Sequence, residues 1–128
     1  MHKPEYLFHG ARREIEILEP SQGIGPGESD NEFGVYAVSK FEWAMLFSFS
    51  FYPTGEGALY SMDPLKNPPE IVLKNTKIDW NKIGYVYKVK SDTFELIDSV
   101  QWLSKVEVKP VEVICVDPNE YKHWVTYK

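Results

Sequence analysis

The 128-residue chain is poor in cysteine, histidine and arginine, and each shortage disfavours a class of protein. Cys115 is the only cysteine, so no disulfide can form within the chain. The three histidines and this cysteine show no spacing typical of metal ligands, so we expect no metal. Arg12 and Arg13 are the only arginines and the net charge is −5, which disfavours a nucleic-acid partner because phosphate binding normally needs a basic stripe.

Long hydrophobic runs are missing too. The longest apolar stretch, within residues 41–52, is interrupted by Glu42 and two serines and is too short to span a bilayer. The first ten residues, "MHKPEYLFHG", lack the apolar centre of a signal peptide. We therefore expect no membrane partner and a reducing, cytoplasmic setting.

The composition that is present suits a globular chain. Hydrophobic residues make up 43% of the sequence and aromatic residues 15%, enough to build a core without disulfides. The length fits one domain, so we expect residues 1–128 to fold as a single unit.

The apolar pattern predicts one main helix, over about residues 39–52, and many strands. Ser39 and Glu42 have the S-x-x-E spacing of a capping box, and apolar residues then recur at intervals of three and four. Segment 11–20 fits either a short helix or an extended stretch, and 21–32 is a long Gly-rich loop of the kind that often carries specificity. Because no crossover helices separate the strands, we expect an α+β fold with a largely antiparallel sheet. The predicted strands are 5–10, 33–38, 70–75, 83–90, 92–98, 100–104 and 109–116.

Three short motifs follow one another along this pattern. "LFHG" ends the first strand in His9 and Gly10, and "GVYAVSKFEWA" carries Tyr36 into the predicted helix. "QWLS", starting at Gln101, opens a later strand. In order and spacing this set resembles the ADP-ribosyltransferase superfamily, in its diphtheria-toxin and poly(ADP-ribose) polymerase branch. Members of that branch carry His-Gly, then Gly-(Ile/Val)-Tyr before a helix, then Glu followed by an aromatic residue.

The resemblance implies split antiparallel sheets around a cleft for NAD, which serves as co-substrate. It implies that the backbone of Gly10 pairs with the nicotinamide carboxamide, that His9 hydrogen-bonds the adenosine-side ribose, and that Tyr36 stacks on the nicotinamide ring. These residue types suit those roles, since glycine lets a flat amide approach its backbone and tyrosine offers a rigid π-face.

Two more positions follow from the resemblance. A second aromatic residue on the helix often sandwiches the nicotinamide in the family, and Phe47 is the candidate here, with Leu46 as the alternative register. Ala11 stands where relatives often carry a serine or threonine that contacts the ligand, which is a milder departure from the family than Gln101, and we expect Ala11 to be among the NAD-binding residues.

The third motif has two candidates. Asn119-Glu120-Tyr121 matches the polymerases literally, but only eight residues follow Glu120, and the family needs room there for further strands. Gln101 leaves that room, with residues 111–116 as the later strand, so we favour Gln101. His9, Tyr36 and Gln101 would then stand where the family has its catalytic His, Tyr and Glu.

Glutamine at position 101 leaves the activity open. It keeps the size and hydrogen-bonding reach of glutamate but loses its charge, which typically costs roughly 10²–10³ in rate and much less in NAD binding. The resemblance thus implies either a transferase that passes ADP-ribose to an unknown acceptor and releases nicotinamide, or an NAD- or ADP-ribose-binding module without turnover. The more distant alternatives are an RNA 2′-phosphotransferase-like protein, which would need more arginines, and a plain protein-interaction domain.

Overall fold

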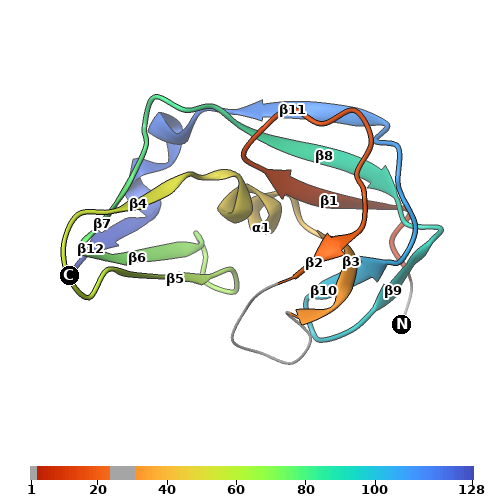
Figure 1. Ribbon diagram of the computed structural model, residues 1–128, viewed down its shortest axis with the longest axis horizontal. Coiled ribbons are helices and arrows are strands. Elements are labelled where there is room, and N and C mark those ends of the chain that lie inside the picture. Colours follow the sequence, from red (N-terminus) through yellow and green to blue (C-terminus); the bar gives the residue numbers. More distant parts are fainter. Residues whose placement is uncertain (1–2, 24–30) are drawn as a thin grey trace.

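The computed structural model describes residues 3–23 and 31–128, and it is an α+β protein built mostly from antiparallel strands (Figure 1). This confirms the fold class expected from the sequence at that coarse level. The Gly-rich loop predicted at 21–32 falls largely outside the described residues, except that Ser21–Gln22 forms the short strand β2.

The main sheet of the described chain has seven strands. Its order is β11-β8-β1-β3-β10-β9, with β2 also pairing with β3, and every neighbouring pair is antiparallel. Each of its longer strands coincides with a stretch that the sequence predicts as a strand, because apolar and aromatic residues there are bounded by turn residues. The bounds are β1 Tyr6–Ala11, β3 Phe33–Val38, β8 Gly84–Lys90, β9 Phe94–Leu96, β10 Gln101–Ser104 and β11 Glu112–Val116.

Two smaller sheets complete the described part of the fold. The first has the order β12-β6-β5, with β5 at Leu59–Asp63, β6 at Glu70–Lys74 and β12 at Val125–Tyr127. The second pairs β4, Phe51–Pro53, with β7, Thr76–Ile78. The β12–β6 pair is parallel, and a 3₁₀ segment, η3 at Pro118–Trp124, leads into β12.

The main helix is shorter than predicted. The α-helix α1 covers Phe41–Met45 and continues as the 3₁₀ turn η2, Leu46–Ser48, after which the chain becomes the strand β4. The prediction of a helix to residue 52 was wrong because residues 47–52 read "FSFSFY". Aromatic residues that alternate with serine have the period of two of a strand, and Pro53 follows.

The predicted capping box is also absent. The residue at the N-cap is Lys40, in extended conformation and without a side-chain cap bond. A capping box needs its glutamate three residues after the cap, whereas Glu42 lies only two residues after Lys40. The helix thus starts one residue later than the Ser39 register requires.

The helix lies directly against the main sheet, and two glycines allow this approach. A Cβ added to Gly10 on β1 would lie 2.0 Å from the carbonyl oxygen of Ala44, and one added to Gly84 on β8 would lie 2.4 Å from that of Ser48. One buried cluster joins α1 and η2 to β6, and another fills the opposite side of the sheet. In Figure 1, α1 lies beside β1 and between the two larger sheets. None of the helices in the described ranges is long and apolar enough to cross a membrane.

Candidate functional site

The main sheet opens between β1 and β3. The strand β1 pairs with β8 over six residue pairs, from Tyr6↔Lys90 to Ala11↔Tyr85. In the described chain, its pairing with β3 on the other side is limited to Phe8↔Val38. The strand β3 pairs instead with β10 over four residue pairs. His9 and Gly10 therefore lie just past the point at which β1 and β3 separate.

The backbone of Gly10 faces this opening. In an antiparallel ladder, successive residues direct their N–H and C=O groups alternately to the two neighbouring strands. The N–H of Ser91 donates to the carbonyl of Glu5. The odd-numbered residues of β1 therefore direct their backbone N–H and C=O groups toward β8. The even-numbered residues, Phe8 and Gly10, then direct their backbone groups toward β3. Gly10 thus presents a donor and an acceptor where β3 has moved away.

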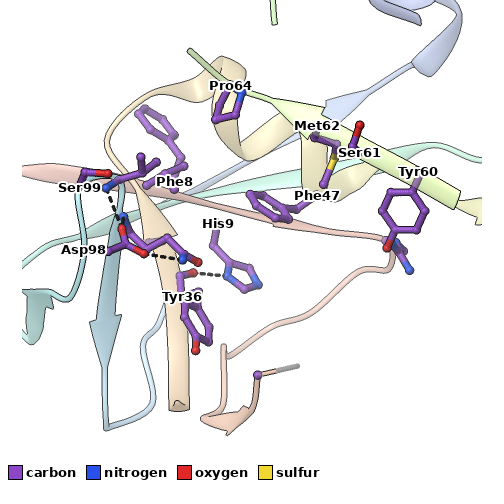
Figure 2. Close-up of a pocket in the computed structure, with 17 residues that line it drawn as sticks. Phe8, His9, Tyr36, Phe47, Tyr60, Ser61, Met62, Pro64, Asp98 and Ser99 are labelled. Atoms are coloured by element: carbon purple, nitrogen blue, oxygen red, sulfur yellow. Dashed lines mark hydrogen bonds between the residues drawn. The ribbon is translucent and has the colours of Figure 1, made fainter. Parts of the chain in front are cut away.

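A pocket of about 830 Å³ occupies the opening, and it brings together five of the residues selected from the sequence. They are His9, Gly10, Tyr36, Phe47 and Gln101. In Figure 2 the rings of His9, Tyr36 and Phe47 gather in one part of the pocket, with Asp98 and Ser99 toward one end and Tyr60 toward the other. The remaining lining residues are Phe8, Arg12, Gly23, Ala37, Val38, Ser61, Met62, Pro64 and Val100.

His9 is half-buried, and its ring is held by the strand across the opening. Its Nδ1–H donates to the backbone carbonyl of Tyr36 at 2.5 Å (Figure 2). Because a carbonyl can only accept, this bond places the proton on Nδ1 and leaves Nε2 as an acceptor in the neutral ring. Desolvation lowers the pKa of His9 from its usual 6.5, and the hydrogen bond to Tyr36 offsets part of that shift.

This pKa shift predicts a pH-dependent stability. A histidine whose pKa is lower in the folded than in the unfolded state binds fewer protons when folded, so stability is full above pH ~6.5 and falls as the pH drops toward the folded-state pKa. We expect the free energy of unfolding, measured with urea, to decrease between pH 7.5 and 5.5, by at most about 1.4 kcal/mol per pH unit. His9→Gln should flatten this dependence and the exposed-site variant His123→Gln should keep it. Equal slopes in all three proteins would contradict the assignment.

Tyr36 and Phe47, the two candidate stacking residues, are held in different ways. The hydroxyl of Tyr36 accepts from the N–H of Glu32 at 2.8 Å, which ties the ring to the start of its own strand. Phe47 is 47% exposed and lines the pocket. Leu46, the alternative register, is 1% exposed in the core and does not line the pocket, so only Phe47 of the two reaches it.

Two other candidates lie outside the pocket. Ala11 is not among its lining residues, because its side chain is buried in the core cluster with Leu7 and Leu18. Glu120 is exposed on η3 and does not line the pocket either. Gln101, at the first position of β10 and paired with Val38, is thus the third-motif candidate that the fold brings to the site.

Sequence reasoning missed two charged residues of the pocket. Arg12 donates from Nε to the carbonyl of Phe49 at 2.9 Å and lies 5.8 Å from the centre of the Phe51 ring. In the sequence, Arg12 could have been selected because it lies two residues after the His-Gly motif. Asp98 lies at the turn before β10, and its role depends on a hydrogen bond that no spacing rule reveals.

The carboxylate of Asp98 is bound to Gln101. Its Oδ1 accepts the backbone N–H groups of Val100 at 2.7 Å and Gln101 at 2.6 Å. Its Oδ2 accepts the side-chain Nε2 of Gln101 at 2.7 Å. Both side chains are half-buried and both line the pocket, so the amide at position 101 sits next to a carboxylate.

Comparisons of this chain with protein-family models, with curated proteins and with solved structures found no match.

Proposed function

We propose that this pocket binds NAD and that the protein is an ADP-ribosyltransferase of the His-Tyr-Glu type in which Gln101 replaces the glutamate. One observation carries the proposal. His9, Tyr36, Phe47 and Gln101 come from separate segments of the chain, were chosen because of a resemblance in sequence, and line one pocket together with Gly10. A chance match of short motifs gives no reason for the residues to converge in space.

The pocket offers complementary groups for the nicotinamide half of NAD. The carboxamide has one donor and one acceptor side, which suit the C=O and N–H that Gly10 directs into the opening. The aromatic faces of Tyr36 and Phe47 suit the flat cationic ring. His9, with Nε2 as an acceptor, suits a ribose hydroxyl.

Size and charge support a dinucleotide. A pocket of about 830 Å³ is within the range of about 300–1,000 Å³ typical of small-molecule sites. The guanidinium of Arg12 contributes positive charge to the lining, although the whole chain carries a net charge of −5. Arg12 is suited to hold one of the two phosphates.

The reaction proposed is the transfer of ADP-ribose from NAD. The bond between C1′ of the nicotinamide ribose and the ring nitrogen breaks, and its electron pair goes to that nitrogen, so neutral nicotinamide leaves. A nucleophile on the acceptor forms the new bond to C1′ and loses its proton to solvent. With water as acceptor, the products are ADP-ribose, nicotinamide and one proton. Positive charge develops on the ribose during this step, so negative charge near C1′ accelerates it.

Incubation of the protein with NAD tests the proposal. We expect saturable binding of NAD by calorimetry and time-dependent release of nicotinamide by chromatography, with an equal amount of ADP-ribose found free or attached to protein. Excess ADP-ribose should compete with NAD and reduce the release of nicotinamide. Release that ADP-ribose does not reduce would come from a site other than the pocket. A flat calorimetric titration with NAD and no release of nicotinamide would contradict the proposal.

A binding module without turnover is the second candidate, and the amide at position 101 is the observation that favours it. Glutamine can hydrogen-bond a ribose hydroxyl as glutamate does, but it carries no charge of its own to stabilise the transition state. Saturable NAD binding in the same calorimetric experiment, with no nicotinamide released, would identify this alternative.

A further inference from the structure

We infer that Asp98 is a positioning residue for the proposed transfer reaction: it fixes the amide of Gln101 with its oxygen turned away from Asp98, and it supplies negative charge to the site through that amide. The inference rests on the proposed function of the pocket. It assigns a role to a residue that none of the three sequence motifs contains.

The orientation of the Gln101 amide follows from the chemistry of its partner. Both oxygens of Asp98 accept N–H donors, which is the bonding pattern of an ionised carboxylate. A carboxylate cannot donate, so the Gln101 group that faces it at 2.7 Å must be the Nε2 amide nitrogen. The two terminal atoms of an amide lie on opposite sides of its axis, so Oε1 is directed away from Asp98.

The pair places negative charge one hydrogen bond from position 101. A hydrogen bond from Nε2 to a carboxylate draws electron density toward Oε1 and makes it a stronger acceptor. An acceptor of this kind at position 101 can hold a ribose hydroxyl, as the family's glutamate does. Because Asp98 also lines the pocket, its charge acts over a short distance on positive charge that develops in the bound ribose.

The position of Asp98 is fixed from three sides. Two backbone N–H groups hold Oδ1 across the turn formed by residues 98–101, and the side chain of Gln101 holds Oδ2. Gln101 is itself anchored by its pairing with Val38 on β3. The carboxylate and the amide therefore move little relative to each other, as preorganised electrostatic stabilisation requires.

Asp98→Asn tests this inference. The variant keeps the shape of the side chain but removes the charge, and its NH₂ group can replace the carboxylate oxygen opposite Gln101. The amide of Gln101 must then turn its oxygen toward that NH₂ group and its Nε2 toward the pocket. We expect kcat for nicotinamide release to fall about 10²-fold while the Kd for NAD changes less than about 3-fold.

Asp117→Asn is the matched control. Asp117 also accepts a backbone N–H and a side-chain amide, both from Asn119 at 3.0 Å, but it lies outside the pocket. Its variant should keep the kcat of the wild-type protein. Thermal unfolding of both variants measures any loss of stability separately from the loss of turnover.

The double variant Asp98→Asn/Gln101→Glu exchanges the amide and the carboxylate across the same hydrogen bond. The bond is retained, with the amide nitrogen introduced at position 98 now donating, and the charge moves to position 101. We expect kcat to recover at least about 10-fold relative to Asp98→Asn. This variant is easier to interpret than Gln101→Glu alone, in which two carboxylates would face each other. Its turnover can also be measured if Asp98→Asn does not fold.

The outcomes separate this inference from the proposed function. Release of nicotinamide by the wild-type protein with an unchanged kcat in Asp98→Asn would overturn the role of Asp98 and leave the transferase in place. A folded double variant without turnover would overturn it as well. A wild-type protein that releases no nicotinamide would refute the transferase itself, and the role of Asp98 with it.

Discussion

Tyr36→Ala is expected to weaken NAD binding about 5- to 150-fold, the equivalent of about 1–3 kcal/mol of lost stacking. The ring of Tyr36 lines the pocket, and its hydroxyl is bonded to the backbone of Glu32, so little freedom is lost when a flat ring stacks on it. Removal of the ring leaves the other contacts of the pocket but deletes one of the two aromatic faces proposed to sandwich the nicotinamide ring. Calorimetric titration with NAD measures the change directly.

Two variants serve as controls for this result. Tyr36→Phe keeps the π-face and removes the hydroxyl that is bonded to the backbone of Glu32, so its affinity for NAD should stay within about 3-fold of wild type. Tyr127→Ala removes a tyrosine that is 58% exposed on β12, outside the pocket, and should bind as the wild-type protein does. An unchanged Kd in Tyr36→Ala would exclude a stacking role for this residue.

Gly10→Ala is expected to lower the free energy of unfolding by about 3 kcal/mol. The added Cβ would lie 2.0 Å from the carbonyl oxygen of Ala44 and 3.0 Å from the Cβ of Phe47. The first of these neighbours is backbone, so the helix must move away from β1, and overpacking of this kind costs typically about 1–3 kcal/mol and at times more. The same movement displaces Phe47, so NAD binding should weaken as well. Urea unfolding gives the first quantity and calorimetry the second.

Gly55→Ala is the matched control for that substitution. The nearest atom to its added Cβ lies 3.7 Å away, an ordinary contact, so its stability should stay within about 0.5 kcal/mol of wild type. Equal stability of Gly10→Ala and Gly55→Ala would show that α1 does not pack on β1 in the way described above.

Long strands could be predicted from the sequence because their pattern is local. The segment 33–38, "FGVYAV", is bounded by polar residues and forms β3 with the predicted bounds. The segment 83–90 alternates tyrosine and valine with other residues and forms β8 from Gly84. In both cases β-branched and aromatic side chains leave few alternatives to a strand.

The errors arose where tertiary contacts decide the local structure. The prediction of a helix over 39–52 extended it through Phe51, which instead pairs with Ile78 on β7, a strand that is distant in sequence. The strand β5 at Leu59–Asp63 was missed because its exposed residues have no clear alternation, and it forms by pairing with β6. Short strands of this kind gain their stability from partners that a local pattern does not contain.

Some residues of the candidate site could likewise be predicted from the sequence, and others could not. His9, Gly10, Tyr36 and Gln101 could be selected because short motifs keep their order along the chain. Asp98 could not be selected in this way. Its role depends on a hydrogen bond across a turn, and aspartate is common in turns of every kind. Ala11 was selected because it follows Gly10 in the motif. Its side chain is buried in the core, whereas the ring of His9, on the same face of β1, is bonded to Tyr36 across the opening.

A crystal structure of the protein with NAD tests the central claim most directly. We predict that the carboxamide of nicotinamide lies about 2.8–3.2 Å from the backbone N and O of Gly10, with the ring stacked on Tyr36 and a ribose hydroxyl near Nε2 of His9. We also predict Oε1 of Gln101 on the side of the ribose. NAD bound elsewhere on the protein, or bound in this pocket without contact to Gly10 and Tyr36, would contradict the claim.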